Sequence, residues 1–274
     1  MVRGFRPTPA GYDALVTSTL DNRSSRSTGT RQLAWVVLGA AIVEVVAPLV
    51  TINGPGSSPA SGSGPDLLIT PVGWAFSIWG VIYTLAIVQA VAVLVHGAHT
   101  ISRRLQIDLI VLYLGGALWI ALAGLDNSYA TAAALLLMFV AAVDAVLTTA
   151  REPIAPRWLS VLTHASVGLY AGWVTAAFFL NVSTALVDAG PVEADELAWQ
   201  LVVLVIAAVV LLTVLVRTRG IVAYAAAGVW AMIGISVTGS SDGTTGVVVT
   251  ALAAAAVLVA ATAALQLRGR RAAR

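Results

Sequence analysis

The sequence predicts an all-α polytopic membrane protein with about eight transmembrane helices. Hydrophobic residues make up 59% of the chain and charged residues only 10%, whereas soluble domains average about 25% charged residues. A helix needs about 20 apolar residues to cross the hydrocarbon core of a bilayer. Segments of that length, separated by polar, glycine or proline residues, lie at 33–53, 73–95, 105–125, 129–150, 158–182, 197–216, 220–239 and 246–267.

The basic residues lie on one side of this predicted topology. All 15 are arginine, and they precede the first span or follow the even-numbered spans, whereas the other loops contain acidic residues and no arginine. Because cytoplasmic loops carry the positive excess, we expect both termini in the cytoplasm. The arginine-only, alanine-rich and valine-rich composition suggests a bacterial inner membrane. A signal peptide is the competing interpretation of 33–51, but the long polar leader favours a signal-anchor.

Composition also excludes several chemistries. The chain has no cysteine, so it forms no disulfide, thiolate nucleophile or cysteine-ligated metal site. It has no lysine, so it forms no Schiff base with retinal or pyridoxal phosphate. Neither a Ser-His-Asp order, a glycine-rich phosphate loop nor a His-x-x-x-His pattern occurs. We therefore predict no catalytic residues, no metal ligands and no nucleic-acid partner.

Aromatic residues lie at one depth on three of the predicted spans. At 1.5 Å per residue, Trp79, Trp119 and Trp173 each lie about 9 to 12 Å inside the outer ends of their spans. Trp79 and Tyr83 are four residues apart and Tyr170 and Trp173 three apart, so each pair shares a helix face. An indole N–H at that depth favours the protein interior or a ligand over lipid. Core packing is the alternative for each residue alone, but the shared depth favours a pocket.

Three segments of the chain resemble the tryptophan-rich sensory protein family, also called the translocator protein or peripheral benzodiazepine receptor family. TPVGWAFSIWGVIY at 70–83 is similar to the second-helix signature, in which a proline precedes a W-G/T-x-L-Y element. LYLGGALWIALAG at 112–124 resembles the third-helix motif, with Gly115 or Gly116 in place of an asparagine, and YAGWVTAAFFLN at 170–181 resembles the fifth-helix motif. The three motifs occur in the family's order and at its helix positions.

The resemblance implies a five-helix bundle whose pocket is capped by the loop after the first helix. In the family this pocket accepts tetrapyrroles such as protoporphyrin or haem and, in some members, sterols. The three later spans lie outside the basic family plan and are interpreted as an appended dimerisation or regulatory unit, or as half of another architecture. The resulting division is a disordered cytoplasmic tail at 1–32, the five-helix bundle at 33–182, three additional helices at 183–268 and a cytoplasmic tail at 269–274.

We therefore predict an integral membrane binding protein, a sensor or carrier, for a flat apolar ligand, with a porphyrin as first choice. No cofactor is required beyond a bound porphyrin or haem, and the expected partners are membrane lipid and a hydrophobic small molecule, with a homodimer left open. Light-driven oxidation of a bound porphyrin is the enzymatic alternative that the family suggests. The loop 54–70 would cover the pocket, since its end, LLIT, is apolar enough to fold back. The predicted ligand-binding residues are Pro71, Phe76, Trp79, Tyr83, Trp119, Tyr170, Trp173 and Asn181.

Titratable residues inside the predicted spans support an alternative function, a proton-coupled small-molecule transporter. Glu44 lies near the middle of the first span, where an unpaired charge costs at least a few kcal/mol. Asp108, Asp144 and His164 lie one to two turns from the cytoplasmic ends of their spans, and as a cluster they would form a proton relay or a haem-ligand site. Pairing of the two aspartates with neighbouring arginines at the interface is the competing interpretation.

Overall fold

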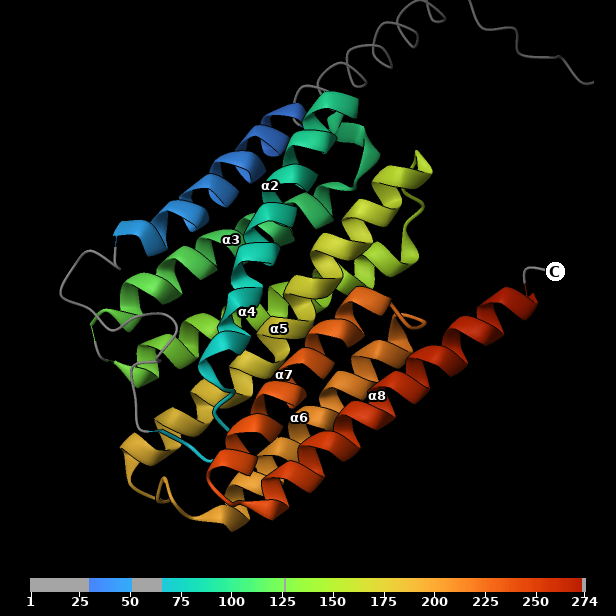
Figure 1. Cartoon of the computed structure of the whole chain (residues 1–274). Helices are drawn as coiled ribbons and strands as arrows, with labels where there is room; N and C mark the ends of the chain where they lie inside the picture. Colours follow the sequence, from blue (N-terminus) through green and yellow to red (C-terminus); the bar gives the residue numbers. More distant parts are fainter. Residues whose placement is uncertain (1–29, 51–65, 126, 273–274) are drawn as a thin grey trace, which may run out of the picture.

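The chain folds into a bundle of long helices, as the sequence predicts. The computed structural model describes residues 30–50, 66–125 and 127–272, and within them eight helices are long and apolar enough to cross a membrane (Figure 1). No strand occurs in these described ranges. The first helix is Thr30–Val50. The elements that follow are η1 (Gly73–Ser77), α2 (Ile78–His96), η2 (Ala98–Thr100), α3 (Arg103–Ala123), α4 (Ser128–Arg151), α5 (Arg157–Ala189), α6 (Leu197–Arg217), α7 (Val222–Ser241) and α8 (Thr245–Ala272).

Two predicted boundaries are wrong. The fifth span was expected to end at residue 182, but α5 continues to Ala189 and stops at Gly190, whose φ of 82° is the left-handed conformation that commonly ends helices. The predicted division between 182 and 183 therefore falls inside α5. At the C-terminus, α8 extends through residues 269–272, which were expected to be a tail. Arginines in that last turn favour the helix, because cations are stabilised at helix C-termini. Of the tail predicted at 1–32, residues 1–29 lie outside the described residues, and 30–32 are helical.

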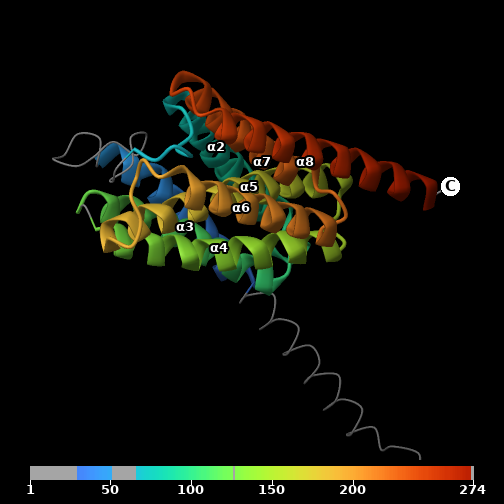
Figure 2. The same cartoon turned by 90° about the horizontal axis from the view of Figure 1, so that it is seen from below.

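Both ends of the described chain lie at the same end of the bundle. In Figure 1 the start of the blue first helix and the end of red α8 point the same way, as an even number of spans requires. Figure 2 shows the last turns of α8 projecting beyond the neighbouring helices. All the arginines of the described residues lie at this end, which we call the arginine-rich end.

The last three helices share one hydrophobic core with the first five. α5 packs against α2, α4, α6 and α7, and α8 packs against α6 and α7. Close contact between α5 and α7 depends on two glycines of α5. A Cβ at Gly172 would overlap the carbonyl oxygen of Tyr224, and a Cβ at Gly168 would lie 3.1 Å from the Tyr224 nitrogen. Small residues let helix backbones approach closely in membranes, so these glycines set the α5–α7 distance.

The segment leading into η1 is tied to the last helices. The Ile69 N–H donates to Gln200 Oε1 of α6 at 3.3 Å, and the Val72 N–H donates to the Gly234 carbonyl of α7 at 3.1 Å. Trp230 of α7 donates its indole N–H to the Ala75 carbonyl at 2.8 Å. The apolar end of the predicted cover loop is thus folded onto the bundle, while residues 54–65 of that loop lie outside the described residues.

The α5–α7 contact predicts a stability difference between two glycine variants. In Gly172→Ala the added methyl meets backbone of α7, and we expect a loss of about 1–3 kcal/mol, the usual range for overpacking. In Gly80→Ala the methyl meets nothing within 4 Å, and alanine favours the helix. Thermal unfolding in detergent should show a lower midpoint for the first variant only. Equal midpoints would contradict the proposed role of Gly172.

Candidate ligand-binding site

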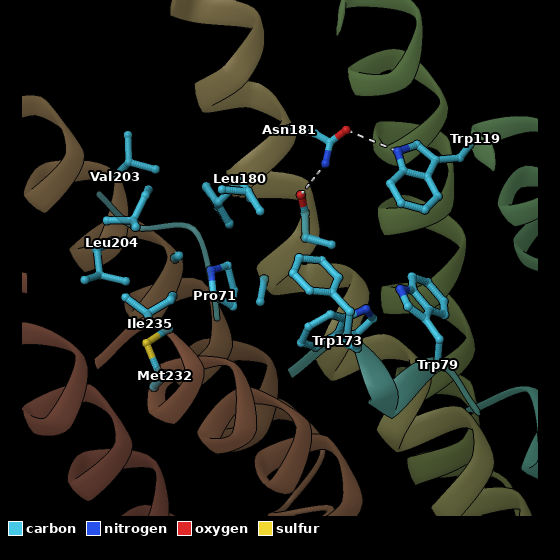
Figure 3. Close-up of a pocket in the computed structure, with 16 residues that line it drawn as sticks. Pro71, Trp79, Trp119, Trp173, Leu180, Asn181, Val203, Leu204, Met232 and Ile235 are labelled. Atoms are coloured by element: carbon cyan, nitrogen blue, oxygen red, sulfur yellow. Dashed lines mark hydrogen bonds between the residues drawn. The ribbon is translucent and has the colours of Figure 1, made fainter. Parts of the chain in front are cut away.

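A cavity lies among α2, α3, α5, α6 and α7 (Figure 3). The lining residues belong to the parts of these helices that lie toward the end opposite the arginine-rich end. The space between the atoms that line the cavity, open solvent included, is about 590 Å³, but only about 40 Å³ of it is wide enough to hold water, so a larger ligand would have to spread the lining side chains. Apolar side chains dominate the wall, and none of the lining residues is charged. Six of the eight predicted ligand-binding residues line this cavity: Pro71, Phe76, Trp79, Trp119, Trp173 and Asn181.

The other two predicted residues support the wall and do not form it. Tyr83 stacks against Trp79, with ring centroids 5.4 Å apart and planes at 28°. Tyr170 meets Trp79 edge to face at 5.8 Å and is fully buried. Both tyrosines contact the indole of Trp79 but are absent from the lining. Their structural effect is to fix the position of Trp79.

The three tryptophans predicted to share a depth form one cluster. Trp79 lies 6.1 Å from Trp119, with planes at 28°, and 6.2 Å from Trp173, with planes at 88°. Phe76 adds an edge-to-face contact with Trp173 at 5.7 Å. Such offset and perpendicular geometries are the favoured arrangements of aromatic pairs. The rings from α2, α3 and α5 thus present one continuous aromatic wall.

Two polar groups of the wall differ in their hydrogen bonding. Trp119 donates its indole N–H to Asn181 Oδ1 at 3.1 Å, and Asn181 Nδ2 donates to the Ala177 carbonyl at 3.2 Å (Figure 3). Asn181 therefore orients Trp119. Trp173 is only 2% exposed, and its indole nitrogen has no hydrogen-bond partner among the described residues. A buried N–H without an acceptor costs about 1–3 kcal/mol, so an acceptor placed here would be favoured.

Sequence reasoning missed one wall of the cavity. Beyond the aromatic cluster, α6 and α7 contribute apolar side chains, and the loop before η1 contributes Ile69. None of the predicted ligand-binding residues came from the last three spans, because nothing in an apolar span distinguishes a lining residue from a lipid-facing one. The lining residues from α6 and α7 are Val203, Leu204, Ala207, Met232 and Ile235.

Glu44 lies beside this aromatic cluster and is fully buried. The Tyr170 hydroxyl donates a hydrogen bond to Glu44 Oε1, while Oε2 has no partner among the described residues. Gly116 of α3 makes room for the pair, since a Cβ there would overlap Glu44 Oε1. The ring of Tyr113 stacks on the ring of Tyr170, with centroids 5.9 Å apart and planes at 22°. Glu44 is thus linked to the cavity wall through Tyr170 and Trp79.

Of the other three titratable residues, Asp108 and Asp144 lie together and His164 lies apart. Arg104 binds Asp144 through both carboxylate oxygens, at 2.7 and 2.5 Å, and Asp108 lines the same groove between α3 and α4. His164 lines a separate hollow with Arg219, and its Nδ1 lies 2.7 Å from the Ser160 carbonyl oxygen. Within the described part of the chain, no group of three or more metal-ligating side chains occurs. His164 lies apart from the aspartates because the face of α5 that carries His164 is turned toward α7 and α8.

The Glu44–Tyr170 pair predicts a recoverable loss of stability. Tyr170→Phe removes the donor and leaves the buried carboxyl without its bond, at a cost of about 1–3 kcal/mol. Adding Glu44→Met removes the buried polar group, so the double variant should regain most of the loss. Thermal unfolding of the single and double variants measures this. A single variant as stable as the parent, or a double variant no better than the single, would contradict the pairing.

Comparison with known proteins places this architecture in a family. A family model described as TSPO-like protein matches residues 32–264. The match runs from the first helix into α8, so it includes the three helices that the motif resemblance left outside the five-helix plan. No curated protein and no solved structure matches the chain. The cavity, its aromatic wall and its α6–α7 wall all lie within the matched residues, and the chain is a multi-pass membrane protein that belongs to the TSPO-like protein family.

Proposed function

We propose that this protein is a membrane-embedded binding protein, a sensor or carrier, for a flat apolar small molecule that occupies the aromatic cavity. The observation that carries the proposal is the convergence of Trp79, Trp119 and Trp173 from three helices around one space. Concave, mostly apolar spaces with a few polar groups are the usual form of small-molecule sites. The proposal includes a bacterial inner membrane, with the arginine-rich end in the cytoplasm.

The chemistry of the wall indicates which molecules fit. Indole faces favour a planar conjugated ring, and the free N–H of Trp173 favours a hydrogen-bond acceptor on that ring. Since no lining residue is charged, ionised groups of a ligand would remain at the open side of the cavity. A porphyrin, with a flat core and peripheral carboxylates, matches this chemistry and is the first ligand to test, and the lining side chains would have to move apart to admit it. Pro71 and Ile69 would cover it from the loop side.

Protoporphyrin IX binding tests the site directly. We expect purified protein in detergent to bind it saturably, measured by tryptophan quenching and by the ligand's own absorbance. Trp79→Ala with Trp173→Ala should weaken binding by about tenfold or more, because two stacking surfaces are lost. Trp35→Ala with Trp158→Ala is the matched control, since those indoles are 58% and 47% exposed and line no part of the cavity. Equal affinity in the two double variants would place the site elsewhere.

A second pair of variants keeps every tryptophan and tests the α7 wall. Met232 is buried and lines the cavity, whereas its neighbour Ile233 is exposed and does not. Met232→Phe should narrow the cavity and weaken binding of protoporphyrin IX, while Ile233→Phe should leave it unchanged. If both variants bind as the parent does, α7 forms no part of the binding site.

Proton-coupled transport is the second candidate, and Glu44 is the observation that favours it. An ionisable group buried within a span is expensive and often functional, and Glu44 contacts the cavity wall through Tyr170. Its predicted partners offer less, because Asp144 is ion-paired with the exposed Arg104 and His164 lies apart.

A flux assay separates the two candidates. If the protein couples transport to protons, porphyrin flux into liposomes driven by a pH gradient should vanish in Glu44→Gln and persist in Asp144→Asn. Flux that is independent of the gradient, or equal in both variants, would contradict coupling through Glu44.

A further inference from the structure

A second hollow opens at the arginine-rich end of the bundle, away from the aromatic cavity. It lies between the first turns of α5, the turn from α6 to α7 and the last turns of α8, and contains about 1000 Å³ of space between atoms, much of it open. Its lining is divided by character. Ser160, His164, Arg219 and Gln266 are polar, whereas Val161 and Val222 are apolar.

The turn that carries Arg219 is held against α8. Gln266 of α8 donates its side-chain N–H to the Gly220 carbonyl at 2.7 Å. Arg219 and Gly220 both adopt positive φ, at 57° and 84°, a conformation that non-glycine residues adopt infrequently. A Cβ at Gly220 would lie 2.9 Å from the Leu265 Cβ, so only glycine lets the turn approach so closely. Arg219 is therefore presented at a fixed place on the rim.

The charge around the hollow is positive and unbalanced. Arg219 is exposed, and none of the lining residues is acidic. The ion pair among the described residues joins Arg104 of α3 to Asp144 of α4, and neither residue lines the hollow. Arg157, Arg217 and Arg268 lie at the starts or ends of the helices around the hollow, also without an acidic partner in the described structure. A cationic rim of this kind attracts anions.

The apolar part of the lining indicates an amphiphilic anion. Val161 and Val222 are 63% and 58% exposed, although they belong to transmembrane helices and lie within one turn or so of the helix ends. Arg219 and the polar lining groups thus lie beside exposed valines of membrane-spanning helices. A phospholipid likewise joins a charged phosphate to apolar acyl chains, and basic pockets between transmembrane helices are known to hold such headgroups.

We propose that this hollow binds the phosphate headgroup of an anionic phospholipid of the cytoplasmic leaflet. Arg219 supplies the principal positive charge, and Ser160, His164 and Gln266 surround the headgroup. Val161 and Val222 contact the acyl chain. The site shares no lining residue with the aromatic cavity, so it stands whether or not the cavity binds a porphyrin.

Binding of phosphatidylglycerol to the full chain tests the proposal. Delipidated protein in detergent is titrated with dioleoyl phosphatidylglycerol or dioleoyl phosphatidylcholine, and bound lipid is counted by native mass spectrometry. We expect phosphatidylglycerol to bind more tightly than phosphatidylcholine. Arg219→Asn, which tolerates positive φ, should weaken phosphatidylglycerol binding about fivefold, the effect of one basic residue near a membrane surface. Arg219→Lys should bind within about twofold of the parent.

The matched control is Arg270→Asn. Arg270 lies in the last turn of α8 and does not line the hollow. Ser160→Asp is a second test that keeps Arg219; an acidic residue suits the first turn of a helix, and it should repel the headgroup. The proposal is overturned if Arg270→Asn weakens binding as much as Arg219→Asn, or if Ser160→Asp binds as the parent does. It is also overturned if inorganic phosphate displaces the lipid at equal concentration, which would indicate a site for free phosphate.

Discussion

The close approach of α5 and α7 is the contact on which the rest of the bundle depends. Lipid gives two helices no hydrophobic reason to associate, so close packing and buried hydrogen bonds must hold them together. Gly168 and Gly172 permit that packing, and Thr175 adds a buried contact of 3.2 Å between its hydroxyl and that of Tyr224. With α7 held at this distance, Met232 and the neighbouring α6 side chains face the aromatic wall, and the space between them becomes the cavity.

Most polar side chains near the cavity are hydrogen-bonded to other protein groups and hold neighbouring side chains in position. The Asn181 amide accepts a hydrogen bond from Trp119 and donates one to the α5 backbone, and the Tyr170 hydroxyl donates one to Glu44. In a low-dielectric interior such satisfied bonds fix side chains more firmly than apolar contact alone. Trp173 is the exception, since its N–H has no acceptor among the described residues. A ligand would thus meet an ordered apolar wall that includes one buried indole N–H without an acceptor.

Sequence patterns predicted the spans and the aromatic level because both follow from helix geometry and bilayer thickness. They did not predict which helix faces meet. Met232 and Ile233 are both large apolar residues, yet Met232 lines the cavity and Ile233 is exposed. The competing interpretation of Asp144 paired it with an arginine near it in the sequence, but its partner is Arg104 of another helix. The resemblance pointed to a glycine at 115 or 116 in place of an asparagine, and only the structure shows that Gly116 makes room for Glu44.

The structure also changes the meaning of the last three helices. If the last three helices were an appended unit, the first five helices would enclose the pocket by themselves, and the added helices would pack only on the outside of that bundle. Here the cavity has α6 and α7 as one of its walls, and the segment entering η1 is bonded to Gln200 and Gly234 on those helices. Without them, the glycine surface of α5 and the side of the cavity facing α7 would open to lipid. The family match through residue 264 agrees with this: α6 and α7 are part of the cavity, and α8 packs behind them.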